Sequence, residues 1–351
     1  MAQSRTVFSL SLVAAIALVA VVAGVVVGRA TSSGSATGGG GGSGGAASGQ
    51  KVDVIIRATD SAYWQTLLAG ADAAATDFGI TVGKFGPTSE TDIAGQVQLV
   101  ENSVSRGVNA IVIAPSSSEA LNASIDAARK AGIKVITADT KVTAAIEGHI
   151  GTNNKLAGTQ AGERMCQLLT AAGKTTGKVL VEAPIAGIEA NQDRDAGFRA
   201  GLAEKCPNID SKLQNYNNND IGTAASQVND AISANPDLVG VFADNNSSGV
   251  GAATAIKDNN AADRIPVVAF DSDPAENAAL AAGTIDALVV QNPYFLGYQG
   301  VIEAAMSTQG RIPPAILDPG VTIAKPHGPA VLARLPQFVG TFRGTAKRMC
   351  W

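Results

Sequence analysis

Polar side chains that can donate and accept hydrogen bonds stand just after most of the long apolar runs of this 351-residue chain. They are carboxylates, amides and an adjacent aromatic pair: Asp60, Tyr63, Trp64, Asp139, Asn245, Asp271 and Gln291. Neutral polyhydroxyl ligands need this mixture, because each hydroxyl both donates and accepts. An aromatic ring then covers the apolar face of the ligand. These residue types predict a binding site for a small sugar or polyol.

Residue sets typical of catalysis or metal binding are not found in the sequence. The two histidines, His149 and His327, have neither the spacing of a zinc site nor a neighbouring nucleophilic Cys or Ser. The phosphate-binding motif Gly-x-x-x-x-Gly-Lys-Ser/Thr does not occur. Asp271 and Asp273 form one carboxylate pair, but no second pair supports acid–base work on a substrate. We therefore expect no catalytic residue, no metal and no cofactor.

A dinucleotide-dependent enzyme is the sharpest alternative. Glycines occur at Gly249 and Gly251, after the apolar run 238–243, and Asp271 follows about 20 residues later, as a dinucleotide fingerprint requires. However, the first glycine lies well beyond the run, and Thr254 stands where the third glycine is expected. We interpret Gly251 as a position at which a helix packs closely on the sheet.

Seven apolar runs of strand length alternate with helical patterns along the chain. The runs are nearly continuous, which is typical of strands buried on both faces of a parallel sheet. They cover residues 52–57, 110–114, 134–138, 178–182, 238–243, 266–270 and 286–290, with weaker strands at 80–84 and 212–216. Helices are predicted at 62–78, 91–106, 118–131, 155–172, 193–205, 222–233, 247–258, 274–281 and 295–307. Ligands of open α/β sheets bind beyond the carboxyl ends of the strands, so the polar residues above are expected to line one cleft.

The strands fall into two consecutive series, each of which should form a parallel sheet with right-handed crossovers. The predicted fold class is α/β, with two similar doubly wound parallel-sheet lobes joined by a three-segment hinge. Crossings between the lobes are expected at 151–154, 291–293 and 317–320. The N-terminal lobe would comprise residues 51–152 and 292–317, and the C-terminal lobe residues 153–291 and 318–325.

The two ends of the chain differ in composition from this body. Residues 7–27 are apolar and uncharged, which fits either a cleaved signal peptide or a membrane anchor within residues 1–30. Residues 31–50 form a Gly/Ser-rich linker. Residues 326–351 form a C-terminal tail, either an amphipathic appendage or a loosely ordered segment. The folded body is expected outside the cytoplasm, attached to the membrane if the N-terminal segment is not cleaved.

Charge and cysteine content limit the partners and the cross-links. The net charge is −4, and Lys and Arg residues form no evident cluster along the sequence that could make a basic patch. We therefore expect no nucleic-acid partner. A transcriptional regulator with the same two-lobe body would have an N-terminal helix-turn-helix. This chain has a membrane-directing segment and a linker there instead, which excludes that class of protein. An exported body permits disulfides, and Cys166 and Cys206 fall in or beside the helices that flank the strand at 178–182. They are predicted to form a disulfide, with two free buried thiols as the alternative.

Several motifs in order along residues 51–324 resemble those of a known family. They are Val-Ile-Thr-Ala-Asp at 135–139, Arg-Asp-Ala-Gly-Phe at 194–198, Asn-Pro-Asp at 235–237 with Val-Phe-Ala at 241–243, Val-Val-Ala-Phe-Asp at 267–271 and Gln-Asn-Pro at 291–293. The chain resembles the solute-binding proteins of bacterial ABC sugar importers, in the ribose-binding group of type I periplasmic binding proteins. This resemblance implies that Asp139 and Asp271 accept protons from ligand hydroxyls, that Arg194 and Asn245 donate, and that Gln291 contacts the ligand near a crossing.

The chain departs from that group at several positions around the expected site. The usual Asn-Pro-aromatic-aromatic motif is replaced by Ser61, Ala62, Tyr63 and Trp64, so the aromatic stacking role carries over but the Asn contact does not. Other replacements are Thr140 for an Arg, Ala114 for an Asn, Asn219 for an aromatic residue and Arg57 for a smaller residue. A linear polyol or another small sugar is therefore an alternative to ribose. Arg57 and Asp60 are expected either to contact the ligand or to form a salt bridge at the cleft mouth.

The resemblance implies the solute-binding component of an ABC-type carbohydrate importer. The ligand would bind between the lobes and stabilise a closed form, which docks on a membrane permease. A monomer that makes and breaks no bond is expected. A sugar chemosensory receptor protein would use the same body and stays as a second alternative.

Overall fold

A computed structural model of the protein describes residues 49–325 except 312, 314 and 315. The predicted signal peptide or anchor, the linker up to residue 48 and the tail from residue 326 lie outside the described residues. Within that part of the chain, no helix combines the length and the apolar character needed to cross a bilayer.

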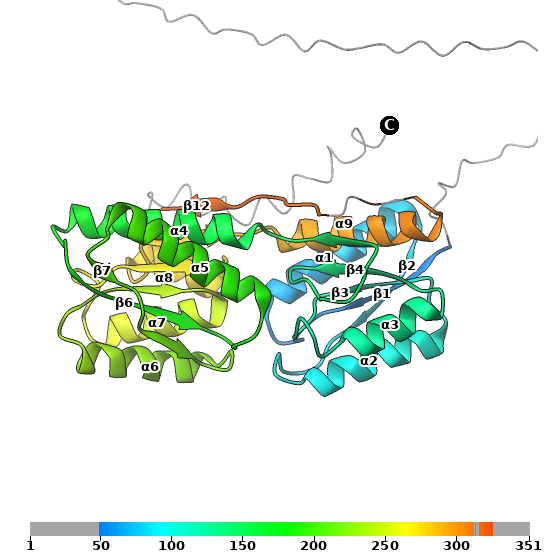
Figure 1. The fold of residues 1–351 in the computed structure, drawn as a ribbon, viewed down its shortest axis with the longest axis horizontal. Coiled ribbons are helices and arrows are strands. Elements are labelled where there is room, and N and C mark those ends of the chain that lie inside the picture. The colour runs from blue at the N-terminus through cyan, green and yellow to red at the C-terminus, as the bar shows by residue number, and fades with distance from the viewer. Residues whose placement is uncertain (1–48, 312, 314–315, 326–351) are drawn as a thin grey trace, which may run out of the picture. The chain divides into compact units, whose positions relative to one another are not determined.

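A first sheet of five parallel strands has the order β2-β1-β3-β4-β5. The strands are β1 (Lys51–Ile55), β2 (Thr81–Phe85), β3 (Ala110–Ile113), β4 (Lys134–Ala138) and β5 (Gly148–Ile150). Helices α1 (Ala62–Phe78) and α9 (Pro293–Thr308) cover one face, and α2 (Ile93–Arg106) and α3 (Asn122–Lys130) cover the other (Figure 1). We call this sheet and its four helices the first lobe.

A second sheet of seven strands has the order β12-β11-β10-β9-β6-β7, with β8 paired to β6. The strands are β6 (Gly177–Ala183), β7 (Ile209–Asp210), β8 (Gln214–Tyr216), β9 (Leu238–Ala243), β10 (Val267–Phe270), β11 (Ala287–Val290) and β12 (Thr322–Ala324). The helices are α4 (Asn154–Ala171), α5 (Glu189–Lys205), α6 (Ile221–Ala234), α7 (Asn246–Asp258) and α8 (Pro274–Ala282). Helices α4 and α5 cover one face, and α6 and α7 cover the other (Figure 1). This second lobe is parallel except at β12, which runs antiparallel to β11.

Both faces of each sheet are buried, which explains the continuous apolar runs. Successive side chains of a strand point to opposite faces. In β1, Val54 packs in the cluster with α1 and α9, whereas Ile55 packs with α2 and α3. In β9, Val241 packs with α6 and α7, whereas Phe242 packs with α4 and α5. Each run therefore serves two hydrophobic clusters.

The predicted elements are found with small shifts at their ends. Each of the seven apolar runs contains a strand, and α1 has the predicted bounds of 62–78. The strands that the sequence did not predict, β5, β7 and β12, are only two or three residues long. Such short strands carry no run of apolar residues that could mark them.

The chain passes between the two sheets at three places. It leaves the first sheet after β5, returns to the first lobe after β11 through α9, and leaves it again after Leu317 toward β12. Leu317 forms an isolated bridge with Ile150, and its N–H donates to the carbonyl of His149 at 2.9 Å. The passage after β5 and the passage near Leu317 are therefore paired with each other. The residue limits given above for the two lobes remain a prediction.

Helices α4 and α5 lie unusually close together. A Cβ atom on Gly158 would lie 2.2 Å from the carbonyl oxygen of Arg194, and one on Gly197 would lie 2.1 Å from that of Lys155. At the other end of this helix pair a disulfide joins Cys166 to Cys206, with 5.8 Å between their Cα atoms. The glycines and the disulfide together fix α5, which carries Arg194.

Candidate functional site

A pocket at the carboxyl ends of the strands takes its walls from both lobes. It encloses about 420 Å³, including space open to solvent. Its lining residues are Arg57, Ser61, Tyr63, Trp64, Glu90, Asp139, Pro184, Ala190, Asn191, Arg194, Asn219, Asn245, Asn246, Ser247, Asp271 and Gln291. The lining contains every residue predicted for ligand binding except Asp60 and Thr140.

Two aspartates occupy equivalent positions in the two lobes. Asp139 directly follows β4 and Asp271 directly follows β10, and both have positive φ angles, 66° and 83°. Their N–H groups still donate to neighbouring strands, to Ile150 at 2.9 Å and to Val289 at 3.0 Å. Aspartate tolerates this left-handed region better than most residues. The turn ends each strand and places a carboxylate in the pocket wall.

Arg194 is held in one orientation by several partners. Its Nε donates to Asn154 Oδ1 at 2.8 Å, Nη1 donates to the carbonyl of Asp244 at 2.8 Å and Nη2 donates to Gln291 Oε1 at 3.0 Å. The guanidinium carbon lies 4.4 Å from the centre of the Phe270 ring. A guanidinium fixed in this way is preorganised to donate to a ligand, with little side-chain entropy left to lose.

Gln291 links the second-lobe wall to the first crossing. Its Nε2 donates to Asp271 Oδ1 at 2.6 Å, and its Oε1 also accepts from Thr152 Oγ1 at 2.7 Å. Burial raises the pKa of Asp271, while the Arg194 charge and the Gln291 hydrogen bond act in the opposite direction. Arg194 Nη2 is 4.0 Å from Asp139 Oδ1, so opposite charges of the two lobes meet at the pocket.

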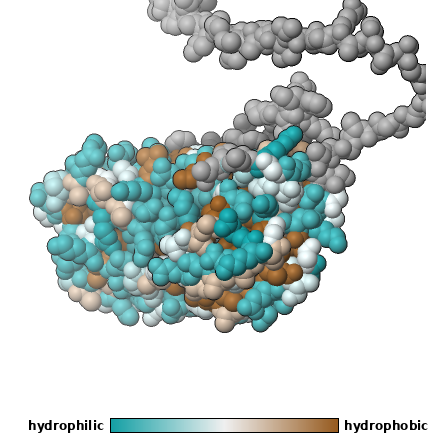
Figure 2. Space-filling view, turned by 45° about the vertical axis from the view of Figure 1, so that its right-hand side comes forward, coloured by the Kyte–Doolittle hydropathy of each residue, from teal (hydrophilic) through white to brown (hydrophobic). Residues whose placement is uncertain are grey.

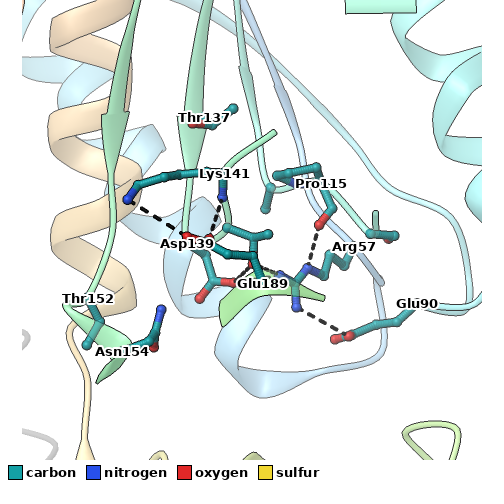
Figure 3. Close-up of polar contacts among 12 residues, drawn as sticks. Arg57, Glu90, Pro115, Thr137, Asp139, Lys141, Thr152, Asn154 and Glu189 are labelled. Atoms are coloured by element: carbon teal, nitrogen blue, oxygen red, sulfur yellow. Dashed lines mark hydrogen bonds and ion pairs between the residues drawn. The ribbon is translucent and has the colours of Figure 1, made fainter. Parts of the chain in front are cut away.

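Arg57 lies inside the first-lobe wall and is only 5% exposed. Its Nε donates to the carbonyl of Pro115 at 3.0 Å, and its Nη2 donates to Asp139 Oδ2 at 2.9 Å and also to Thr140 Oγ1. Its Nη1 lies 3.8 Å from Glu90 Oε2 (Figure 3). Thr140, which was expected to contact the ligand, is buried outside the pocket lining and accepts a hydrogen bond from Arg57.

The salt bridge, one of the two alternatives expected for Arg57 and Asp60, is not found among the described residues, and Arg57 makes the inner contacts instead. Asp60 is exposed and does not line the pocket. Arg57 is buried among Asp139, Glu90 and Thr140, because the carboxylates of the pocket wall provide its partners.

The aromatic pair contributes polar contacts to the pocket. Tyr63 Oη donates to Asp139 Oδ1 at 2.8 Å, and burial followed by the Asp139 charge raises the Tyr63 pKa well above its usual value. Trp64 is 3% exposed, and its Nε1 donates to Glu90 Oε1 at 2.6 Å. The two rings are nearly perpendicular, at 86°, with their centroids 4.7 Å apart. Ring stacking on the ligand stays a prediction for both residues.

The remaining predicted residues lie at helix starts and a nearby turn. Asn245 caps α7 by accepting from Ser248 N–H at 3.0 Å, and its Nδ2 donates to Asn219 Oδ1 at 2.7 Å. Asn219 has a φ of 61°. Ser61 precedes α1, and its side chain makes no capping hydrogen bond.

Sequence reasoning missed some lining residues: Glu90, Pro184, Ala190, Asn191, Asn246 and Ser247. Asn246 and Ser247 directly follow the predicted Asn245, and Asn191 lies one helical turn before Arg194, so their positions could have been found. Glu90 lies in the loop between β2 and α2, after a strand that the pattern predicted only weakly.

The glycines of the dinucleotide alternative serve helix packing. A Cβ atom on Gly249 would lie 3.0 Å from that of Ala269 in β10, and one on Gly251 would lie 2.5 Å from that of Ala224 in α6. Gly251 therefore faces a helix, not the sheet as predicted. Among the described residues, no group of three His, Cys, Asp or Glu side chains is placed to hold a metal ion.

Most of the described chain is similar to known proteins. Residues 52–311 match the family model described as periplasmic binding protein domain. A ribose import binding protein of Salmonella typhimurium is 28% identical over 258 residues, covering 73% of this chain and 84% of that protein.

Two solved structures of carbohydrate-binding transport proteins are similar as well. A carbohydrate transporter solute-binding protein of Agrobacterium radiobacter, in complex with D-arabinose, is 31% identical with a TM-score of 0.78, over 82% of this chain and 98% of that one. An ABC transporter solute-binding protein of Agrobacterium vitis, bound to α-D-tagatopyranose, is 31% identical with a TM-score of 0.75, over 81% and 98% of the two chains.

Proposed function

Because the chain belongs to the periplasmic binding protein family, we propose that it is the solute-binding component of an ABC-type carbohydrate importer. Its ligand is a small sugar or polyol that binds in the pocket between the lobes. Similar proteins include a ribose import binding protein and structures with bound D-arabinose and α-D-tagatopyranose. Ribose, D-arabinose and α-D-tagatopyranose are all monosaccharides, which supports a ligand of this size class.

The observation that carries this proposal is the polar network of the pocket. Asp139 and Asp271 provide acceptors, Arg57 and Arg194 provide donors, and Gln291 provides both. These buried groups hydrogen-bond to one another, and ligand hydroxyls would take over part of this bonding. An analogue lacking one hydroxyl would leave a buried partner unsatisfied, which gives such a site its specificity.

Closure of the two lobes couples binding to transport in this proposal. The ligand stabilises the closed arrangement because it contacts Asp139 of the first lobe and Arg194 and Asp271 of the second lobe together. A ligand shifts such an equilibrium only by its differential affinity for the two forms. The closed form then docks on a membrane permease, and no bond is made or broken.

The protein works outside the cytoplasm in this proposal, as a monomer that is either secreted or held by its N-terminal segment. The face seen in Figure 2 is mainly hydrophilic, with hydrophobic residues in small groups. Large exposed apolar patches usually mark stable interfaces, and this face carries none. A chemosensory receptor role would use the same ligand site and is the second candidate. The packing role of Gly249 and Gly251 weighs against the dinucleotide-dependent enzyme.

Isothermal titration calorimetry of residues 49–351 with D-arabinose, D-tagatose, D-fucose, D-ribose, xylitol and NAD tests the proposal. We expect one sugar or polyol to give a binding isotherm. In a thermal unfolding experiment, the same ligand should raise the melting temperature as its concentration rises. Binding of NAD alone would overturn the importer function.

A further inference from the structure

Glu90 is a pocket residue whose contact with the ligand has not been considered so far. It lies in the loop between β2 and α2 and is 7% exposed. Its Oε1 accepts from Trp64 Nε1 at 2.6 Å, which fixes the carboxylate. Its other oxygen, Oε2, faces Arg57 (Figure 3). Glu90 thus pairs electrostatically with Arg57, but among the described residues no group donates a hydrogen bond to its Oε2.

The distance between Glu90 and Arg57 supplies that reason. Arg57 Nη1 and Glu90 Oε2 are 3.8 Å apart, which is beyond direct hydrogen-bond range. The rest of the guanidinium is fixed by Pro115 and Asp139, so Nη1 cannot close the gap without breaking those bonds. A hydroxyl oxygen placed about 2.8 Å from both atoms would accept from Nη1 and donate to Oε2.

We propose that Arg57 and Glu90 form a subsite for a single ligand hydroxyl in the first-lobe wall, and that this pair determines which sugar the protein selects. The inference rests on the proposed function, because it assigns one contact of the same ligand. It also gives Arg57, which stands where the related group has a smaller residue, a role in specificity. Trp64 is a positioning residue for Glu90 in this arrangement.

Carboxylate and guanidinium together require a group that donates and accepts at once. An ether oxygen accepts only, and a methyl group does neither, so with either group Glu90 Oε2 would still lack a hydrogen-bond donor. A hydrogen bond to a charged group is expected to change affinity by about tenfold to hundredfold. A ligand with its hydroxyl removed at this position should lose that factor.

A cycle of variants and ligand analogues tests the subsite. The reference ligand is whichever of D-arabinose, D-ribose, D-fucose and D-tagatose binds most tightly, and each hydroxyl is removed in turn in a set of monodeoxy analogues. The dissociation constants for the wild type and for Glu90→Gln are measured by calorimetry. Gln keeps an oxygen for the Trp64 indole but places an amide N–H₂ toward Arg57, where a hydroxyl cannot donate.

One analogue should stand out from the rest. Glu90→Gln should weaken the reference ligand and all other analogues by about tenfold or more, but should change the affinity of that one analogue by less than about twofold. Glu147→Gln, on the same lobe but outside the pocket, should leave all affinities unchanged. Arg57→Lys provides a second variant and should single out the same analogue, so the test survives if Glu90→Gln does not fold.

Other outcomes overturn the inference. If Glu90→Gln weakens every ligand equally, Glu90 only positions Trp64, and the subsite is wrong while the importer function stands. If Glu90→Gln and Arg57→Lys single out different hydroxyls, the two residues do not share one hydroxyl. If no sugar binds the wild type, the proposed function fails and this inference fails with it.

Discussion

Replacing Gly158 by Ala should destabilise the protein and weaken sugar binding together. The new methyl group would lie 2.2 Å from the carbonyl oxygen of Arg194, closer than any real Cβ contact, so α4 and α5 must separate. Overpacking of this kind costs about 1–3 kcal/mol. The clash is with backbone, which cannot rotate away, so the upper part of this range, about 2–3 kcal/mol, applies. Ala in a helix interior returns about 0.5–1 kcal/mol relative to Gly, so we expect a net loss of about 1–2.5 kcal/mol.

Urea unfolding and calorimetric titration with a bound sugar measure the two effects. Because α5 carries Arg194, displacement of the helix should also weaken its contacts and lower the affinity by about tenfold. Gly222→Ala is the matched control: this residue is exposed in α6, and a Cβ atom there meets only Asp220 Oδ1 at 3.4 Å. It should change the unfolding free energy by less than about 0.5 kcal/mol and leave the affinity unchanged. A Gly158→Ala variant with wild-type stability and affinity would refute the packing argument.

Three further perturbations have defined outcomes. Asp271→Asn keeps a residue type that tolerates the left-handed backbone but removes the charged acceptor. Calorimetry should then show about tenfold to hundredfold weaker sugar binding. A change in affinity below about twofold would exclude Asp271 as a ligand contact. Burial raises the pKa of Glu182 from 4.5 to about 7. The contribution of Glu182 to the unfolding free energy is therefore fully present below about pH 4.5, where the side chain is protonated, and is lost as the pH rises to 7. Glu182→Gln should flatten the fall in unfolding free energy over that range and stabilise by up to about 3 kcal/mol at pH 8; an unchanged pH profile would contradict this. Replacing Cys166 and Cys206 by Ser removes the disulfide between residues 40 apart in the sequence and should lower the unfolding free energy, measured with urea, by about 2–5 kcal/mol. An unchanged transition midpoint would rule this out.

The fold could be predicted well because both faces of each sheet are buried. Ala110, Ile111, Val112 and Ile113 form one continuous apolar run although alternate members pack on opposite sides, and such a run marks a strand clearly. The three-residue strands β5 and β12 had no such pattern, since pairing with a neighbour alone defines them.

The pocket was harder to predict, because contacts between distant residues decide which polar side chains face it. Arg194 is held by Asn154, 40 residues away, and by Gln291, 97 residues away, and no local pattern records such pairs. Asp60 and Ser61 are neighbours after the same strand, yet only Ser61 lines the pocket. Glu90 entered the pocket through the conformation of a loop, which spacing along the chain does not reveal.

The return of the chain to the first lobe through α9 sets an order for assembly during synthesis. Gly297 in α9 faces the backbone of Leu67 in α1 so closely that a Cβ atom would lie 1.8 Å from its carbonyl oxygen, so the two helices share one side of the first core. That core stays open until residue 308 has left the ribosome, whereas strands β6 to β11 of the second lobe are complete at residue 290. The core of the first lobe therefore stays incomplete until α9 is synthesised, and α9 ends almost 200 residues after β3. The order in which the two lobes occur in the sequence is therefore not the order in which their cores can be completed.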